Sequence, residues 1–191
     1  LKNVFAFFCL GSVLYIFISL VSYSSLDPSL SSVSSLSGDI ENLGGPFGAY
    51  LSDALYSVIG LGAYLLLTII SFAAVKTLFF YQQTDSLHNA IQITSAIFLI
   101  SSFSTLCEFY YSGDYFPQSS SGGLVGNLLF TNLSNIFGVV GSLIFIVIFF
   151  LASVSLTFSF SWLSVMEALG KSTKYFFQEF TSQFIRLVKF T

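Results

Sequence analysis

Charged residues are scarce in this chain, and that scarcity excludes most soluble folds. Only 8% of the 191 residues are Asp, Glu, Lys or Arg, whereas 54% are hydrophobic, and the mean hydropathy is +0.85. A soluble domain carries roughly 25% charged residues. Water cannot solvate so apolar a surface, so we expect the chain to reside in a lipid bilayer.

Residues that could carry chemistry are equally few. Cys9 and Cys107 stand in apolar runs without a C-x-x-C partner, and His88 is the single histidine. One histidine builds neither a metal site nor a catalytic triad, and isolated apolar cysteines usually pack as small hydrophobes. A GKST stretch at 170–173 resembles the end of a phosphate-binding loop, but Val165 stands where that motif needs glycine. We therefore expect no enzyme activity, catalytic residue, metal or cofactor in this chain.

Four uncharged runs predict four transmembrane helices. They cover about 4–22, 54–76, 89–107 and 136–160. Each is long enough for a helix to cross a hydrocarbon core of about 30 Å. The first run is too long for a signal peptide, whose apolar region has about 7–15 residues, so we favour a retained helix. The third run is rich in Ser, Thr and Gln, and we expect it to pack inside the bundle, where hydroxyls bond across helices.

The basic residues predict the orientation of these helices. The segments 23–53 and 108–135 contain no Lys or Arg, so all six basic residues fall on one side of a four-span chain. The topology markers among them are Lys76, Lys171 and Lys174. The positive-inside rule makes that side cytoplasmic. Both termini are then inside, and two loops lie outside.

A glycine pattern occurs twice in the sequence. The stretch GGPFGAYLSDALYSVIG at 44–60 and the stretch GGLVGNLLFTNLSNIFG at 122–138 share four glycines at an offset of 78 residues. The paired positions are Gly44 and Gly122, Gly45 and Gly123, Gly48 and Gly126, and Gly60 and Gly138. Each copy leads into an inward-running span, so we predict two hairpins related as a parallel repeat, with an axis along the membrane normal. Each copy also predicts a short helix at the outer interface.

Glycine permits close approach of backbones, so these eight positions are the candidate packing and interaction residues. They could serve packing within the domain, contact between neighbouring subunits or contact with other proteins. We expect the subunit and partner contacts to dominate.

The segment 166–191 is predicted to be a cytoplasmic amphipathic helix beside the membrane, separate from a transmembrane domain at 1–165. Its apolar face carries Phe177, Phe180 and Phe184, while Lys174 and Arg186 lie largely elsewhere. Anionic lipid explains such a helix better than DNA does, because its basic charge is small.

Several stretches together resemble a known family. They are SYSSLDPSLS after the first span, NLGGPFGAYLSDALYSVIGLGAYLL, GGLVGNLL, and SWLSVMEALG after the fourth span. They resemble the amino-terminal four-helix membrane domain of FtsK/SpoIIIE-type bacterial DNA translocases. The sequence has no initiator methionine, which fits a piece of a longer protein.

The resemblance implies a membrane anchor at the division septum of the bacterial inner membrane. It implies that the anchor localises and assembles a motor that couples cell division to chromosome partition. The partners would be the lipid bilayer, further copies in a hexamer and other division proteins. ATP, Mg and DNA would be bound only by a motor domain that this chain does not contain. The alternative from the residues is a small polytopic channel or transporter, against which stands the absence of ionisable residues near the centre of any span.

Overall fold

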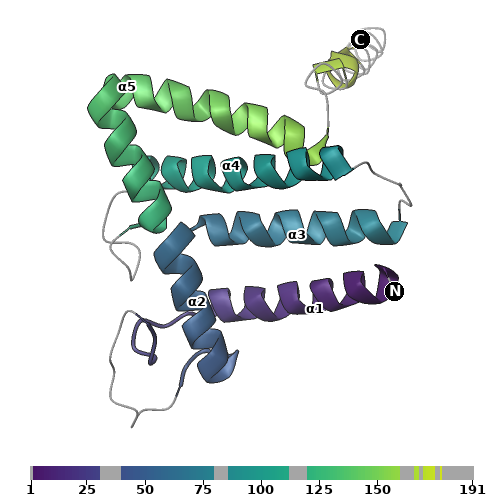
Figure 1. Ribbon diagram of the computed structural model, residues 1–191, viewed down its shortest axis with the longest axis vertical. Coiled ribbons are helices and arrows are strands. Elements are labelled where there is room, and N and C mark those ends of the chain that lie inside the picture. The colour runs from purple at the N-terminus through teal and green to yellow at the C-terminus, as the bar shows by residue number, and fades with distance from the viewer. Residues whose placement is uncertain are drawn as a thin grey trace, which may run out of the picture. The chain divides into compact units, whose positions relative to one another are not determined.

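The computed structural model describes residues 2–30, 40–79, 86–111 and 120–159, and in the tail residues 166, 167, 170–174 and 177. Throughout these residues the regular structure is α-helical (Figure 1). The helices are α1 (Lys2–Val21), α2 (Gly45–Ile59), α3 (Gly62–Phe79), α4 (Ser86–Tyr110) and α5 (Gly123–Phe158). The chain divides into two compact units, Leu1–Thr157 and Phe158–Thr191, whereas the sequence placed a boundary after residue 165.

Four of the helices are long and apolar enough to cross a membrane. The candidate spans are Val4–Val21, Gly62–Phe79, Ser86–Tyr110 and Gly123–Phe158. The all-helical class and the number of spans therefore agree with the sequence. The chain is a multi-pass membrane protein.

The bounds of the second and fourth spans differ from the prediction. The run 54–76 is divided, because α2 ends at Ile59, Gly60 adopts a φ of 56°, and α3 begins at Gly62. The run 136–160 overlaps two limbs of α5, because this helix starts at Gly123, bends at Gly138 where φ is 70° and ψ is 168°, and continues in a second limb to Phe158. Hydropathy missed both breaks because the residues on either side of each glycine are apolar.

The long helices lie side by side in one row within the first unit. Figure 1 shows the order α1, α3, α4 and the second limb of α5, with contacts between α1 and α3 and between α3 and α4. The aromatic pairs Phe98–Phe149 and Phe103–Phe150 join α4 to α5, with ring centroids 6.4 and 6.2 Å apart. We call α2 and the first limb of α5, residues 123–137, the crossing helices. They run across the same end of the row.

Small residues let these helices pack closely. Leu20, Ala63 and Leu67 form a core between α1 and α3. The polar α4 is the most enclosed span, because 33% of an apolar 18-residue window in it is buried, against 17–22% of the corresponding window in the other three. The sequence anticipated this enclosure, because hydroxyl-bearing side chains suit protein contacts better than lipid.

The expected bonding across helices occurs at two places, where Ser104 Oγ donates to Ile59 O at 2.8 Å and Thr157 Oγ1 donates to Ser95 Oγ at 3.1 Å, but most of the enclosed hydroxyl groups bond within their own helix. Ser102 Oγ donates to Phe98 O at 2.8 Å, and Ser142 Oγ donates to Val139 O at 2.8 Å. Each hydroxyl is thereby satisfied without a neighbouring helix. The serines act mainly as small spacers between the spans.

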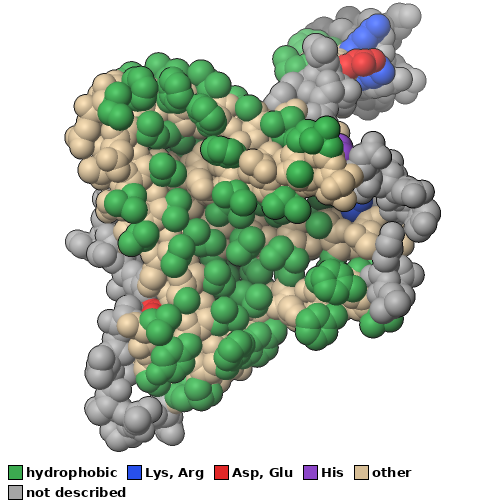
Figure 2. Space-filling view, viewed as in Figure 1, with side chains coloured by type: hydrophobic (Ala, Val, Ile, Leu, Met, Phe, Trp, Pro, Cys, Tyr) green, Lys and Arg blue, Asp and Glu red, His purple; other side chains and the backbone are tan. Residues whose placement is uncertain are grey.

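Large apolar side chains cover the outside of the first unit (Figure 2). On α1 and α5 they include Phe5, Phe8, Ile144 and Ile148, each more than half exposed. In a bilayer such side chains contact lipid tails at no cost, whereas in water they would promote aggregation.

Candidate functional site

The two glycine stretches begin their crossing helices with the same backbone geometry. Gly45 and Gly123 have φ values of 66° and 63°, which favour glycine. The amide of each donates to the carbonyl three residues earlier, at 2.8 Å in the first copy and 3.3 Å in the second. The amides of Gly48 and Gly126 donate to the carbonyl four residues earlier, at 3.2 and 3.1 Å. The sequence repeat is therefore also a repeat of local structure.

The first and third glycines of each copy pack against a serine of the preceding span. A Cβ at Gly48 would stand 2.7 Å from Ser19 Oγ, and one at Gly126 would stand 2.6 Å from Ser104 O. Real Cβ atoms essentially never approach within 3.0 Å. Gly44 and Gly122 lie against the same two serines. The lack of a side chain at these four positions is thus explained by packing within the chain.

The fourth glycine of the first copy meets the second glycine of the second copy. A Cβ at Gly60 would stand 2.6 Å from Gly123 N, and a Cβ at Gly123 would stand 2.6 Å from Gly60 N. Beside them, Leu61 N donates to Ser121 O at 2.9 Å. We call this contact, between residues 59–62 and residues 121–123, the half junction. It joins the two copies of the repeat backbone to backbone.

The remaining two glycines meet no neighbour. Among the described residues, a Cβ at Gly45 or at Gly138 would meet no atom within 4 Å. Both have positive φ, so glycine is still the residue that fits. The eight candidate glycines thus fall into three groups. Four pack against Ser19 or Ser104, two meet at the half junction, and two have no close neighbour among the described residues.

Two carboxylates fix the loops that lead into the crossing helices. Asp27 accepts the backbone N–H groups of Glu41 and Asn42 at 2.8 and 2.9 Å. Glu108 Oε2 accepts the N–H of Gly122 at 3.0 Å and the hydroxyl of Ser120 at 2.6 Å. Sequence reasoning missed this role of the two acids. Their position just beyond two spans was the available signal, because a buried loop amide needs an acceptor.

A buried polar cluster ties α2 to its neighbours. Asp53 is fully buried, and its Oδ1 accepts the hydroxyl of Tyr23 at 3.2 Å. Tyr56 OH lies 3.2 Å from Leu20 O and 2.7 Å from Tyr64 OH. Burial and the hydrogen bond to Tyr64 raise the pKa of Tyr56, so its phenol stays neutral. Sequence reasoning missed this role of Asp53.

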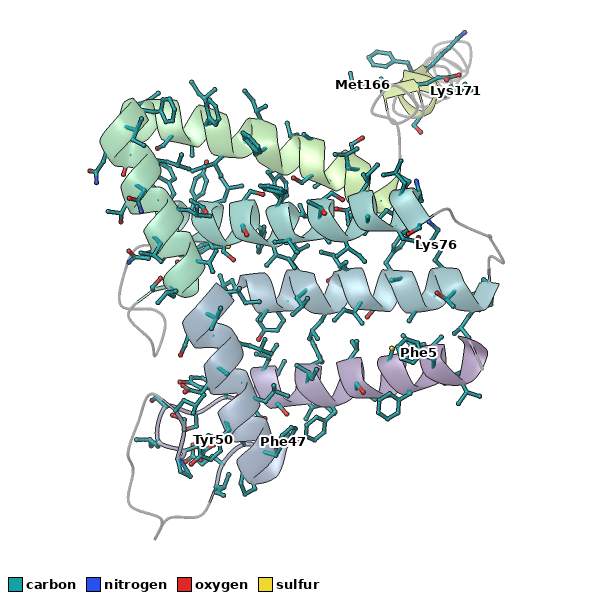
Figure 3. All side chains as sticks on the ribbon, viewed as in Figure 1. Phe5, Phe47, Tyr50, Lys76, Met166 and Lys171 are labelled. Atoms are coloured by element: carbon teal, nitrogen blue, oxygen red, sulfur yellow. The ribbon has the colours of Figure 1, made fainter. Side chains whose placement is uncertain are left out.

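The topology markers occupy two regions. Lys76 lies in the last turn of α3, at the end remote from α2, whereas Phe47 and Tyr50 lie on α2 (Figure 3). Lys171 and Lys174 are exposed, and Lys171 Nζ lies 2.8 Å from Glu167 Oε1. The predicted amphipathic face at Phe180 and beyond lies outside the described residues.

The described residues contain no group of three His, Cys, Asp or Glu side chains that could hold a metal ion. Asp27, Asp53 and Glu108 instead accept hydrogen bonds from the protein itself. The glycines and carboxylates at the start of the crossing helices therefore pack these helices against the spans and fix the loops that precede them.

Comparison with known proteins matches residues 1–170 to the family described as the 4TM region of DNA translocase FtsK/SpoIIIE. The chain is 29% identical over 170 residues to the protein named DNA translocase FtsK 1 of Neisseria meningitidis, covering 86% of this chain and 21% of that protein. It is 30% identical over 178 residues to DNA translocase FtsK of Pseudomonas aeruginosa, covering 91% and 22%. No solved structure matches significantly.

The chain spans about one fifth of the length of these relatives, and the region they share with it is the membrane region. Four apolar helices are what a four-transmembrane region requires. This chain therefore belongs to the FtsK/SpoIIIE family, as its four-transmembrane region.

Proposed function

We propose that this chain is the membrane anchor of a septal DNA translocase, and that it localises and assembles the motor. The observation that carries the proposal is the family match over residues 1–170, together with four apolar helices. The relatives are named DNA translocases and are about five times longer than the region they share with this chain, so pumping DNA with ATP would belong to the rest of such a protein. The anchor would contribute placement and self-association, in the hexamer that the family implies, and contacts with division proteins.

The test of localisation is a fluorescent fusion of the chain, expressed in dividing cells of a related bacterium. We expect a membrane signal enriched at midcell. An even signal around the membrane would contradict septal placement, and a cytosolic signal would contradict the anchor itself.

We further propose that both termini face the cytoplasm. The support is that Lys76 lies at the end of the row remote from the crossing helices, while 23–53 and 108–135 contain no basic residue. Single cysteines replacing Leu30 and Ser86, in a chain without Cys9 and Cys107, should show this. An impermeant thiol reagent added to spheroplasts should label Leu30→Cys and not Ser86→Cys. The opposite labelling would reverse the orientation.

The two halves are proposed to be parallel-repeat hairpins, each with its crossing helix at the outer interface. The shared backbone geometry of the two copies supports the repeat. The crossing helices expose both apolar and polar side chains, and these include Phe47, Tyr50, Leu124, Asn127 and Leu128. Such helices suit the boundary between headgroups and acyl chains. Spin labels at Phe47 and Leu128 should report shallow bilayer depth; deep burial of either label would contradict the placement.

A further inference from the structure

The half junction has a counterpart within each chain that none of the described residues fills. The repeat offset of 78 relates Gly60 to Gly138 and Gly123 to Gly45. Gly60 and Gly123 lie against each other, whereas Gly138 and Gly45 have nothing within 4 Å of a Cβ. Each chain therefore carries one satisfied junction and the two separate halves of a second one.

The two unfilled halves lie at opposite ends of the row of helices. The crossing helices follow one another along one end of the row, so that the end of α2 meets the start of α5 (Figure 1). The start of α2 and the bend of α5 are the two outer ends of that arrangement. Likewise, α1 and the second limb of α5 are the two outermost helices of the row.

The side chains around the unfilled halves are apolar and exposed. Leu43 and Phe47 at the start of α2 are 79% and 69% exposed, and Ile136 and Val140 beside the bend of α5 are 72% and 73% exposed. At the half junction the residues equivalent to Leu43 and Val140 are Ser121 and Gly62, and both are buried. At Leu43 and Val140 the exposure therefore differs in the way expected if a second chain completes the contact, whereas Val58, the equivalent of Ile136, stays 49% exposed at the half junction.

We propose that copies of this chain associate head to tail, with the α5 bend of one chain on the start of α2 in the next. The occupant of each unfilled half is the complementary half of a second copy. The contact repeats the half junction, so Val139 of one chain lies beside Leu43 of the next, as Leu61 lies beside Ser121. Such a heterologous contact closes into a ring when the rotation per chain allows it. The inference rests on the proposal that the anchor self-associates, and it assigns the surfaces.

The second contact is a looser copy of the first. A Cβ at Gly62 would collide with Ser104 Oγ, but the equivalent of Gly62 is Val140. The serine equivalent to Ser104 is Ser19, since both lie under the first and third glycines of their copy. The valine holds the neighbouring α1 farther from α5 than α4 lies from α3. A weaker interface between chains than within one follows from this spacing.

Disulfide trapping tests the proposal in membranes of a chain with Cys9→Ala and Cys107→Ala. A hydrogen bond between neighbouring backbones brings their Cα atoms close to the separation of about 5.5 Å that disulfides need. Mixed single variants Leu43→Cys and Val139→Cys should give a cross-linked dimer on mild oxidation, at least about tenfold above either variant alone. A double variant should give a ladder of linked chains.

Two matched variants control the geometry. Leu61→Cys with Ser121→Cys should close a disulfide within one chain, because Leu61 N and Ser121 O are 2.9 Å apart. Mixing Leu43→Cys with Val75→Cys should give no dimer, since Val75 lies near the far end of α3 from α2.

The outcomes separate this inference from the proposed self-association. If Leu43→Cys alone gives as much cross-linked dimer as the mixture of Leu43→Cys and Val139→Cys, the contact is symmetric, and the head-to-tail arrangement is overturned. A second outcome is that no disulfide forms between chains while each fluorescent particle still bleaches in several steps. The copies would then associate through another surface, and the head-to-tail arrangement would again be overturned. Single photobleaching steps would remove the proposed self-association itself.

Discussion

At the scale of single residues, the two copies of the glycine pattern differ in what a side chain would meet. At Gly48 the nearest atoms are side-chain atoms of Ser19 and Asn42, each 2.7 Å from a Cβ. At Gly126 they are the backbone O and C of Ser104, at 2.6 and 2.9 Å. A side chain can rotate away from a new methyl group, whereas a helix backbone has to move as a unit.

We therefore predict that Gly126→Ala destabilises the domain more than Gly48→Ala does. The expected cost is about 3 kcal/mol for Gly126→Ala and about 1 kcal/mol for Gly48→Ala, within the usual range for overpacking. Gly11→Ala is the control, because a Cβ there has no atom within 4 Å and alanine favours the helix. Denaturation in detergent micelles measures all three. Equal losses at Gly48 and Gly126 would contradict this account of the packing.

The carboxylate of Glu108 should contribute to stability through the loop that it holds. Glu108→Ala removes the acceptor of the Gly122 amide, while the Ser120 hydroxyl keeps only its second acceptor, Gly123 O at 3.0 Å. Hydrogen bonds to a charged group contribute roughly 1.5–3 kcal/mol, so we expect a loss of about 2 kcal/mol. Glu108→Gln keeps one acceptor oxygen and should lose about half as much. Glu41→Ala, at an exposed glutamate, should change stability by less than about 0.5 kcal/mol in the same assay.

At the scale of elements, the turns at Gly60 and Gly138 are equivalent in sequence but not in surroundings. Both need positive φ, which costs a residue with a Cβ about 1–3 kcal/mol. Gly60 also lies against the backbone of Gly123 across the half junction. We predict that Gly60→Ala prevents stable folding, whereas Gly138→Ala costs about 2 kcal/mol or less. Denaturation of the purified monomer in micelles compares the two, and a larger loss at Gly138 would contradict the packing at the half junction.

The elements also show how far the sequence could be read. Four spans were predictable because about 20 apolar residues are needed to cross a bilayer and few other structures use such runs. The breaks after Ile59 and Phe137 were not located, because hydropathy is the same on both sides of Gly60 and Gly138. The glycine offset carried that information, since a shared register of glycines marks positions with shared backbone requirements.

The roles of the eight glycines could be predicted only in part. Positive φ at Gly45 and Gly123 follows from the doubled glycine before an apolar segment. Their partners do not, because contact with Ser19 or Ser104 depends on how the crossing helix lies over the span. The role of the Asp53 carboxylate was missed for the same reason, because only the fold shows that it accepts a hydrogen bond from Tyr23.

At the scale of the whole molecule, the row of helices encloses hydroxyl groups that donate to acceptors within the described helices. Ser102 and Ser142 donate to carbonyls of their own helices, and Thr157 Oγ1 donates to Ser95 Oγ at 3.1 Å. A channel needs polar groups directed to a continuous lumen. Hydroxyls that bond their own backbone are better suited to close packing, which is what an anchor requires.

We therefore predict that the purified chain, reconstituted in liposomes, leaves the membrane impermeable to ions. Potassium flux with valinomycin provides the positive control, and liposomes without protein set the baseline. The expected flux is within about twofold of that baseline, because the enclosed serines are spacers between helices. Substituting Ser102 and Ser142 by alanine should then change neither flux nor assembly, since each hydroxyl serves only its own helix. Flux well above the baseline that falls in the alanine variants would identify the hydroxyl groups as a pathway, and the chain would be a channel of the kind that the sequence left as its alternative.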